Sequence, residues 1–247
     1  RHPAGGFFSS QDADSECKEG TFYTWTEAEI ARVLSPRLAS IFMEAYSLAP
    51  GGEGEGGGIL WLAHPPQDPT LAEEVAAAKA RLQAARSRRV KPTRDDKILA
   101  SWNGLALAAL ADAGRALGSQ LLQETAKDLG HFLATELIDT DFKVSRSWKE
   151  GIRSIPGYLE DYACLVEGFL CLYQSTFDER WFGLARGLTD SMLAQFRRPE
   201  GGFYDTSIEH EDLLVRPRTL QDSPTPSGNS QAAVILLKLA ALKVAQS

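Results

Sequence analysis

The sequence has little of what thiol chemistry, metal binding or a membrane span requires. Its 247 residues include only three cysteines and four histidines, with no CxxC and no HExxH motif. An odd and small number of cysteines excludes a disulfide framework, so we expect a reducing, cytoplasmic compartment, no thiol redox chemistry and no metal site. No apolar run approaches the roughly 20 residues of a membrane span. Neither a P-loop nor a GxGxxG after an expected strand occurs, so no cofactor is predicted.

The charge balance and the acidic residues indicate which partners and ions to expect, and the first residue indicates how the chain arises. Lys and Arg number 26 against 33 Asp and Glu, which gives a net charge of −7. An acidic chain is a poor partner for nucleic acid, and we expect neither a nucleic-acid nor a membrane partner. Asp12 and Asp14 match the first and third positions of a calcium loop, but Cys17 and Tyr23 stand where its Gly and Glu belong, which excludes an EF-hand. Because the first residue is Arg1, we expect a slice or a processed product.

The first third of the chain predicts short and mixed elements. Thr26, followed by acidic residues, is typical of a helix start, and Pro36 ends that helix. The glycines of 50–58 predict a flexible loop. The other expected elements are strands at Gly5–Phe8, Phe22–Trp25 and Ile59–Leu62 and a helix from Arg37 to about Leu48.

The remainder of the chain is predicted to form helices at regular intervals. Apolar residues recur every three or four positions over six segments, which predicts amphipathic helices. Two glycine-aromatic strings, Gly5–Phe8 and Gly201–Tyr204, echo one another, and a helix start with Asn or Asp recurs at Asn103, Asp161 and Asn229. A unit of two helices and a short β excursion therefore repeats about every 60 residues. The six helices are expected at Leu71–Arg89, Ile98–Leu117, Gln120–Ile138, Tyr158–Phe177, Arg180–Arg197 and Ser227–Ala245, and the β excursions at Phe142–Trp148 and Gly201–Asp205.

Helix pairs that repeat in this way stack as a solenoid or as an (α/α) toroid. The segment Leu105–Ala111 has almost no polar face, which is typical of a helix buried all round. The following helix, Gln120–Ile138, is more polar, as an outer helix should be. The pattern therefore favours a toroid, an all-α fold with short β-hairpin excursions, over the whole chain 1–247 as a single domain.

The starts of the inner helices are expected to open on one face and to gather polar and aromatic side chains. Carboxylates on neighbouring packed helices lie about 8–10 Å apart, which fits the roughly 6.5–9.5 Å separation of an inverting glycoside hydrolase. Asp161, among apolar neighbours, is the candidate general acid, and Asp95 or Asp96, beside cations, the candidate base. The residues proposed to bind substrate at this face are Trp102, Asn103, Tyr158, Tyr162, Ser227 and Asn229.

Each of these residues also has a structural interpretation. Asp95 and Asp96 suit the cap of the next helix, and Asp161 in a first turn suits the helix dipole. Pro226 and Ser227 make an ordinary helix start. Aromatic residues belong more often to a core than to a sugar platform.

Four ordered strings carry a resemblance to a known family. They are GGFFSSQDADS from Gly5, RDDKILASWNGL from Arg94, GYLEDYA from Gly157 and TPSGNS from Thr225. In this order they resemble the YyaL-like, or spermatogenesis-associated protein 20, family. The first string adds Asp12 and Asp14 as candidate substrate-binding residues.

The resemblance implies a toroid of the six-hairpin glycosidase and N-acylglucosamine 2-epimerase kind, here incomplete and without the family's thioredoxin-like domain. It also implies a carbohydrate-related superfamily, without a settled reaction, and two hypotheses of different classes remain. The first is a glycoside hydrolase-like or epimerase-like enzyme that acts on a small saccharide by carboxylate acid/base chemistry. The second is a non-catalytic scaffold that serves a thioredoxin-like domain or a protein partner. An incomplete ring also predicts self-association through its uncovered inner helices.

Overall fold

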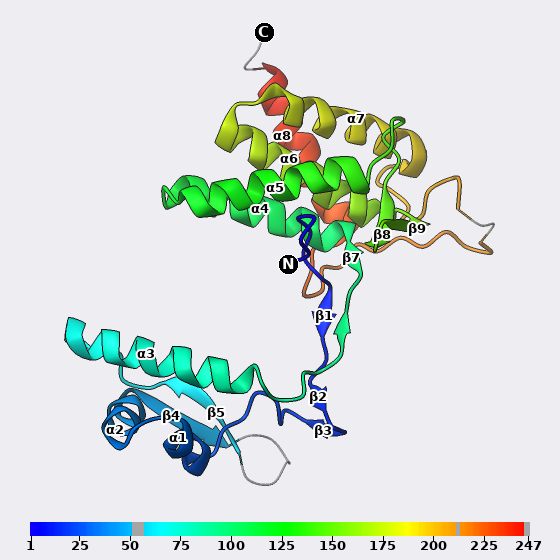
Figure 1. Cartoon of the computed structure of the whole chain (residues 1–247). Coiled ribbons are helices and arrows are strands. Elements are labelled where there is room, and N and C mark those ends of the chain that lie inside the picture. Colours follow the sequence, from blue (N-terminus) through cyan, green and yellow to red (C-terminus); the bar gives the residue numbers. More distant parts are fainter. Residues whose placement is uncertain (51–56, 211–212, 245–247) are drawn as a thin grey trace. The chain divides into compact units, whose positions relative to one another are not determined.

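The computed structural model describes residues 1–50, 57–210 and 213–244, and most of the loop predicted at 50–58 lies outside these ranges. The chain divides into two compact units (Figure 1). The smaller is Ser10–Asp95, and the larger combines Arg1–Ser9 with Asp96–Ser247. The single-domain organisation expected from the sequence remains a prediction. Among the described residues, no helix has both the length and the apolar content needed to cross a lipid bilayer.

The smaller unit packs three helices against a two-stranded sheet. Thr26 caps the first helix with a complete capping box, in which its side chain accepts from Glu29 N and its own N–H donates to the Glu29 carboxylate. Trp25, Ile30, Phe42 and Leu82 belong to its buried core. The elements are β1 (Ser10–Gln11), β2 (Asp14–Ser15), β3 (Lys18–Glu19), α1 (Glu27–Val33), α2 (Pro36–Ala45), β4 (Tyr46–Pro50), β5 (Gly58–Leu62), α3 (Pro69–Arg86) and β6 (Arg94–Asp95).

Three expectations for the short elements are wrong. Gly5–Phe8 forms no strand, and Phe22–Trp25 is a turn with a single bridge from Trp25 to Gly58. The second helix ends at Ala45 because the chain turns into β4, which pairs antiparallel with β5. Pairing with β5 decides where the second helix ends, and at Gly5–Phe8 the Asn103 side chain, rather than a neighbouring strand, binds the Phe7 backbone.

The larger unit consists of two helical hairpins and a further helix (Figure 1). Within each hairpin, the second helix is amphipathic and buries one face, with Leu129 and Leu133 from one and Leu188 and Met192 from the other. The elements are β7 (Ile98–Leu99), α4 (Ala100–Ala116), α5 (Gln120–Glu136), β8 (Ser145–Lys149), β9 (Ile152–Pro156), α6 (Leu159–Thr176), α7 (Glu179–Phe196) and α8 (Gly228–Val244).

Helices α4, α6 and α8 run parallel. Contacts between α4 and α6 pair residues about 60 apart along the whole helix, from Ser101 with Asp161 to Asp112 with Cys171. Contacts between α6 and α8 keep the same direction, from Leu159 near Gly228 to Glu167 with Lys238. The N-terminal ends of all three helices therefore lie together.

Helices α4 and α6 approach closely because glycine leaves room for the backbone. A Cβ placed on Gly104 would lie 2.5 Å from the carbonyl carbon of Cys164, and one on Gly168 would lie 2.7 Å from the Gly104 oxygen. Both distances are shorter than van der Waals contact permits, so any larger residue would force the helices apart.

The inner layer of α4, α6 and α8 and the outer layer of α5 and α7 confirm the predicted (α/α) toroid arrangement in this unit. The inner helix buried nearly all round is α6, however, rather than α4. Leu107 and Ala111 of α4 are buried, whereas Ala109 is exposed, because the described helices cover α4 only from the sides of α5 and α6. The expected β excursion at Gly201–Asp205 is a single bridge between Arg197 and Phe203.

Candidate functional site

A polar cavity of about 300 Å³ opens at the N-terminal ends of α6 and α8. Helix starts supply one part of its wall, and the segment before α8 supplies the other. Among the described residues, two carboxylates and one guanidinium line the cavity, together with five hydroxyls and one side-chain amide. The lining residues are Arg146, Tyr158, Glu160, Asp205, Thr219, Gln221, Ser223, Thr225, Pro226, Ser227 and Gly228.

Arg146, which β8 carries into the cavity wall, joins two adjacent carboxylates of α6. Its Nη1 lies 2.8 Å from Glu160 Oε1 and 3.2 Å from Asp161 Oδ2. The Glu160 side chain keeps 36% of its surface exposed, whereas that of Asp161 has none. Neighbouring helix positions differ by about 100° in direction, so Glu160 faces the cavity while Asp161 points into the protein.

Asp161 receives a donor at every contact the structure gives it. Oδ1 accepts from the backbone N–H of Ser101 at 3.0 Å, and Oδ2 accepts from Tyr158 N at 2.9 Å and from Arg146. Burial raises the pKa of the Asp161 carboxyl, and Arg146 and the two N–H groups oppose that rise. Because all three contacts are donors, the arrangement binds the ionised carboxylate.

The burial of Asp161 does not favour the general-acid role predicted for it. A general acid must come within hydrogen-bond reach of its substrate, but this carboxylate is fully buried. It joins the starts of α4 and α6 and holds Arg146 against Glu160. We therefore treat Asp161 as a positioning residue, and the catalytic assignment remains a prediction.

Asn103 and Asn229 perform one and the same structural task at equivalent places. The Asn103 amide accepts from Phe7 N at 2.8 Å and donates to Phe7 O at 3.0 Å. The Asn229 amide accepts from Phe203 N at 2.9 Å and donates to Phe203 O at 3.1 Å. Each Asn thus clamps the backbone of the phenylalanine in one of the two echoing glycine-aromatic strings. The internal repeat of the sequence therefore corresponds to a repeated tertiary contact, in which an asparagine at a helix start binds the backbone of a phenylalanine.

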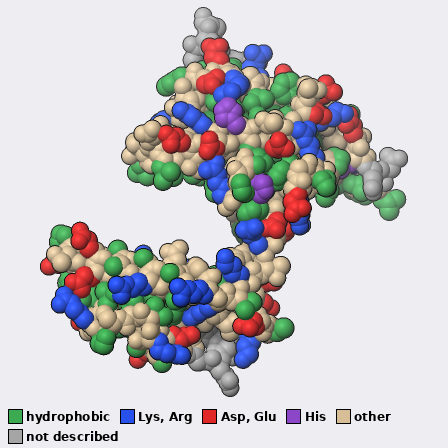
Figure 2. All heavy atoms as spheres, viewed as in Figure 1, with side chains coloured by type: hydrophobic (Ala, Val, Ile, Leu, Met, Phe, Trp, Pro, Cys, Tyr) green, Lys and Arg blue, Asp and Glu red, His purple; other side chains and the backbone are tan. Residues whose placement is uncertain are grey.

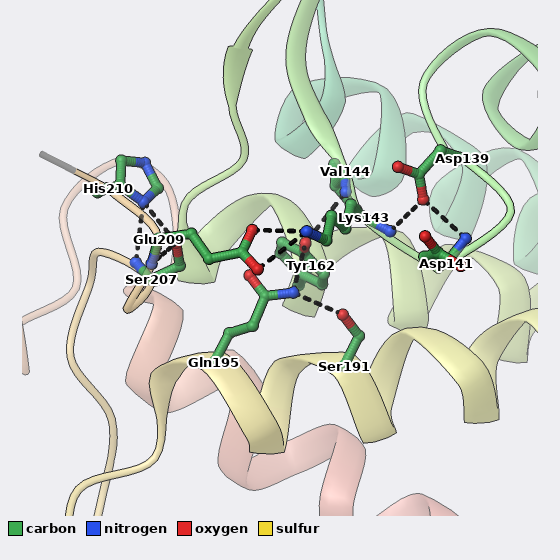
Figure 3. Close-up of polar contacts among 10 residues, drawn as sticks. All are labelled: Asp139, Asp141, Lys143, Val144, Tyr162, Ser191, Gln195, Ser207, Glu209 and His210. Atoms are coloured by element: carbon green, nitrogen blue, oxygen red, sulfur yellow. Dashed lines mark hydrogen bonds and ion pairs between the residues drawn. The ribbon is translucent and has the colours of Figure 1, made fainter.

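Tyr158 and Tyr162 have different surroundings. Tyr158 precedes α6, lines the cavity and stacks on His210, with ring centroids 5.0 Å apart. Tyr162 is 2% exposed, and its hydroxyl accepts from Val144 N at 3.0 Å. In Figure 3, dashed lines join the Tyr162 hydroxyl to the Val144 backbone and to the Gln195 side chain. The structure therefore does not offer Tyr162 to a ligand.

The other predicted residues lie in several places. Ser227 lines the cavity, with its N–H donating to Asp222 and its hydroxyl to Ser230. Trp102, in the first turn of α4, is 46% exposed but does not line this cavity. Asp96 belongs to the larger unit, two residues before β7. Asp12, Asp14 and Asp95 belong to the smaller unit, so their part in a common site remains a prediction.

Three charged residues of the cavity had no role in the sequence-based site. Glu160 stands beside the candidate Asp161, and Asp205 follows the second glycine-aromatic string, so both had a local signal. The Asp205 carboxylate accepts from Thr219 N at 2.9 Å and from the Thr219 hydroxyl at 2.7 Å. Arg146 had no such signal, because only the hairpin of β8 and β9 brings it to α6.

Comparisons with known proteins place the chain among relatives. It is 34% identical to spermatogenesis-associated protein 20 of Mus musculus and 32% identical to that of Homo sapiens, in each case over 96% of this chain and 36% of the relative. The chain thus spans about a third of the length of these curated relatives. A sugar epimerase from a ruminal bacterium superposes on 70% of this chain and 48% of its own, with 14% identity and a TM-score of 0.47. No protein-family model matches the sequence.

Proposed function

The chain belongs to the spermatogenesis-associated protein 20 family, and we propose that the cavity at the starts of α6 and α8 binds a small neutral saccharide. The observation that carries this proposal is the lining of the cavity. Two carboxylates, a guanidinium, hydroxyls and one side-chain amide supply both donors and acceptors. Sugar hydroxyls both donate and accept, so such a wall can pair each of them.

The charges of the cavity favour a neutral ligand over an anion. Glu160 and Asp205 together outweigh the single positive charge of Arg146, which Glu160 already pairs at 2.8 Å. A phosphorylated ligand would face two carboxylates and one engaged cation. A ligand with an extended apolar body would leave the polar lining without partners, which is costly.

Glu160 and Asp205 are also the groups of this cavity that can serve acid/base chemistry. Both are carboxylates of the cavity lining, whereas the carboxylate of Asp161 is buried. Asp161 acts on this pair indirectly, because it holds the Arg146 guanidinium that binds Glu160. Saccharide binding is the primary proposal, and turnover of the bound sugar is its extension.

Calorimetric titration with neutral mono- and disaccharides tests the proposal. Glu160→Gln and Asp205→Asn each remove a charged acceptor, whose hydrogen bond is worth about 1.5–3 kcal/mol, so affinity should fall about tenfold to a hundredfold. Glu179→Gln is the matched control, because Glu179 stands in the first turn of α7 and outside the cavity. A phosphorylated counterpart of the best sugar should bind more weakly than the sugar itself. The proposal fails if no sugar binds, or if both cavity variants bind as wild type does.

A scaffold function is the second candidate, and the exposed face of α8 favours it. Val234 is 43% and Leu237 is 73% exposed, although α8 belongs to the inner layer. An apolar face of this kind is typical of a surface that a partner covers. Sedimentation analysis should then show self-association that Leu237→Ser abolishes, together with no sugar binding.

A further inference from the structure

The smaller unit contains a second cavity, of about 250 Å³, whose apolar wall includes three aromatic residues and two leucines. Trp25, Phe42 and Tyr46 line it, and the first two are 4% and 1% exposed. The rings of Phe42 and Tyr46 stack with centroids 4.7 Å apart and planes 8° apart. The Arg89 guanidinium lies 4.2 Å from the centroid of the Trp25 ring and donates to the carbonyl oxygen of Thr24. The aromatic wall is therefore held in place by packing before any ligand arrives.

The polar groups of this cavity come from one face of α3. Lys79, Gln83 and Arg86 all line it, and their spacings of four and three residues place them in one row. Among the residues that the structure describes, no carboxylate lines the cavity. Within the part of the chain that the structure describes, neither Lys79 nor Arg86 forms an ion pair. Figure 2 shows several Lys and Arg side chains on the smaller unit, with apolar side chains among them.

We propose that this cavity binds an aromatic carboxylate of one or two rings. The rings would pack against Trp25, Phe42 and Tyr46, and the carboxylate would lie beside Lys79 and Arg86. The volume lies just below the roughly 300–1,000 Å³ of common ligand pockets, which suits a compact ligand rather than a long acyl chain. A cation would face the positive charges of Lys79 and Arg86, and a neutral ligand would form no ion pair with either.

Titration with 2-naphthoate and its neutral analogue 2-naphthylmethanol tests this inference in the intact chain. The naphthoate should bind about tenfold more tightly or better, because only its carboxylate can accept charge-assisted hydrogen bonds from Lys79 and Arg86. The double variant Lys79→Gln, Arg86→Gln should reduce its affinity to that of the alcohol. The matched control is Arg81→Gln, Lys91→Gln, which removes the same charge from α3 and the segment after it but from no lining residue.

Gln83 allows a test in both directions without touching the aromatic wall. Gln83→Glu would place a competing carboxylate between the two cations and should weaken naphthoate binding, whereas Gln83→Lys should strengthen it. Gln83 is exposed, so neither variant disturbs the core. The inference is overturned if the alcohol binds as tightly as the naphthoate, if neither probe binds, or if the lining and control double variants behave alike.

Discussion

Replacing Asp161 by Asn tests whether Asp161 links the starts of α4 and α6 or only caps α6. At an exposed helix start, Asn is as good a capping residue as Asp, so the exchange there is nearly neutral. At Asp161 the new amide oxygen can still accept from Ser101 N, but an NH2 group then replaces the oxygen that accepts from Tyr158 N and Arg146, so donor faces donor. The structure therefore predicts that Asp161→Asn destabilises the protein much more than capping alone explains.

The magnitude follows from these contacts. Removing one partner of a buried ion pair costs about 3–5 kcal/mol. Arg146 is 28% exposed and keeps Glu160, which lowers that cost. We expect a loss of about 2 kcal/mol of unfolding free energy for Asp161→Asn and about 3 kcal/mol for Asp161→Ala, which also removes the Ser101 acceptor.

Urea denaturation monitored by circular dichroism measures both losses, provided that the transition is two-state and the slope is unchanged. Asp178 is the matched control, because it caps α7 by accepting from Arg180 N and its side chain is 44% exposed. Asp178→Asn should change stability by less than about 0.5 kcal/mol. If Asp161→Asn proves as harmless as Asp178→Asn, Asp161 is an ordinary cap and the reasoning given above is refuted.

Three further results are expected. Asn103→Ala leaves the backbone N–H and C=O of Phe7 without their side-chain partner and should cost about 2 kcal/mol of unfolding free energy in urea denaturation; wild-type stability would contradict the structural role of Asn103. Burial raises the thiol pKa of Cys164 and of Cys171 to about 12, so a chromogenic thiol reagent at neutral pH should titrate one thiol, that of exposed Cys17, in the native protein and three after denaturation. The hydrogen bond from the Ser227 N–H lowers the pKa of the Asp222 carboxyl. The stability that this hydrogen bond adds should be present above the ordinary pKa of Asp222 and be lost as pH falls through the lowered pKa. An NMR titration midpoint at the ordinary pKa would contradict this.

The helices were predictable because their signal is local. Apolar periodicity placed α4 to α8 within about two residues of their observed bounds, and Thr26 marked the start of α1. The strands β1 and β6 were not predictable, because two residues at each site pair across more than 80 positions of sequence. No local pattern distinguishes such a pair from an extended loop.

The site was predictable in its location but less in its chemistry. Tyr158 and Ser227 line the cavity because they stand where inner helices begin, which the repeat indicated. An Asp or Asn at a helix start can cap the helix, link it to another segment or take part in catalysis. Only the direction of the side chain decides among these roles. The Asn229 side chain binds the Phe203 backbone, and the Asp161 side chain binds Arg146, so both side chains already have partners within the protein. Glu160, one position away, faces the cavity instead.

A crystal structure with the tightest-binding neutral saccharide tests the central claim most directly. The account predicts a sugar in the cavity at the starts of α6 and α8, with hydroxyls within hydrogen-bond distance of the Glu160 and Asp205 carboxylates. Asp161 should remain buried against Arg146 and make no contact with the sugar. A sugar bound elsewhere, for example over the exposed ring of Trp102, or one bound directly by Asp161, would contradict it.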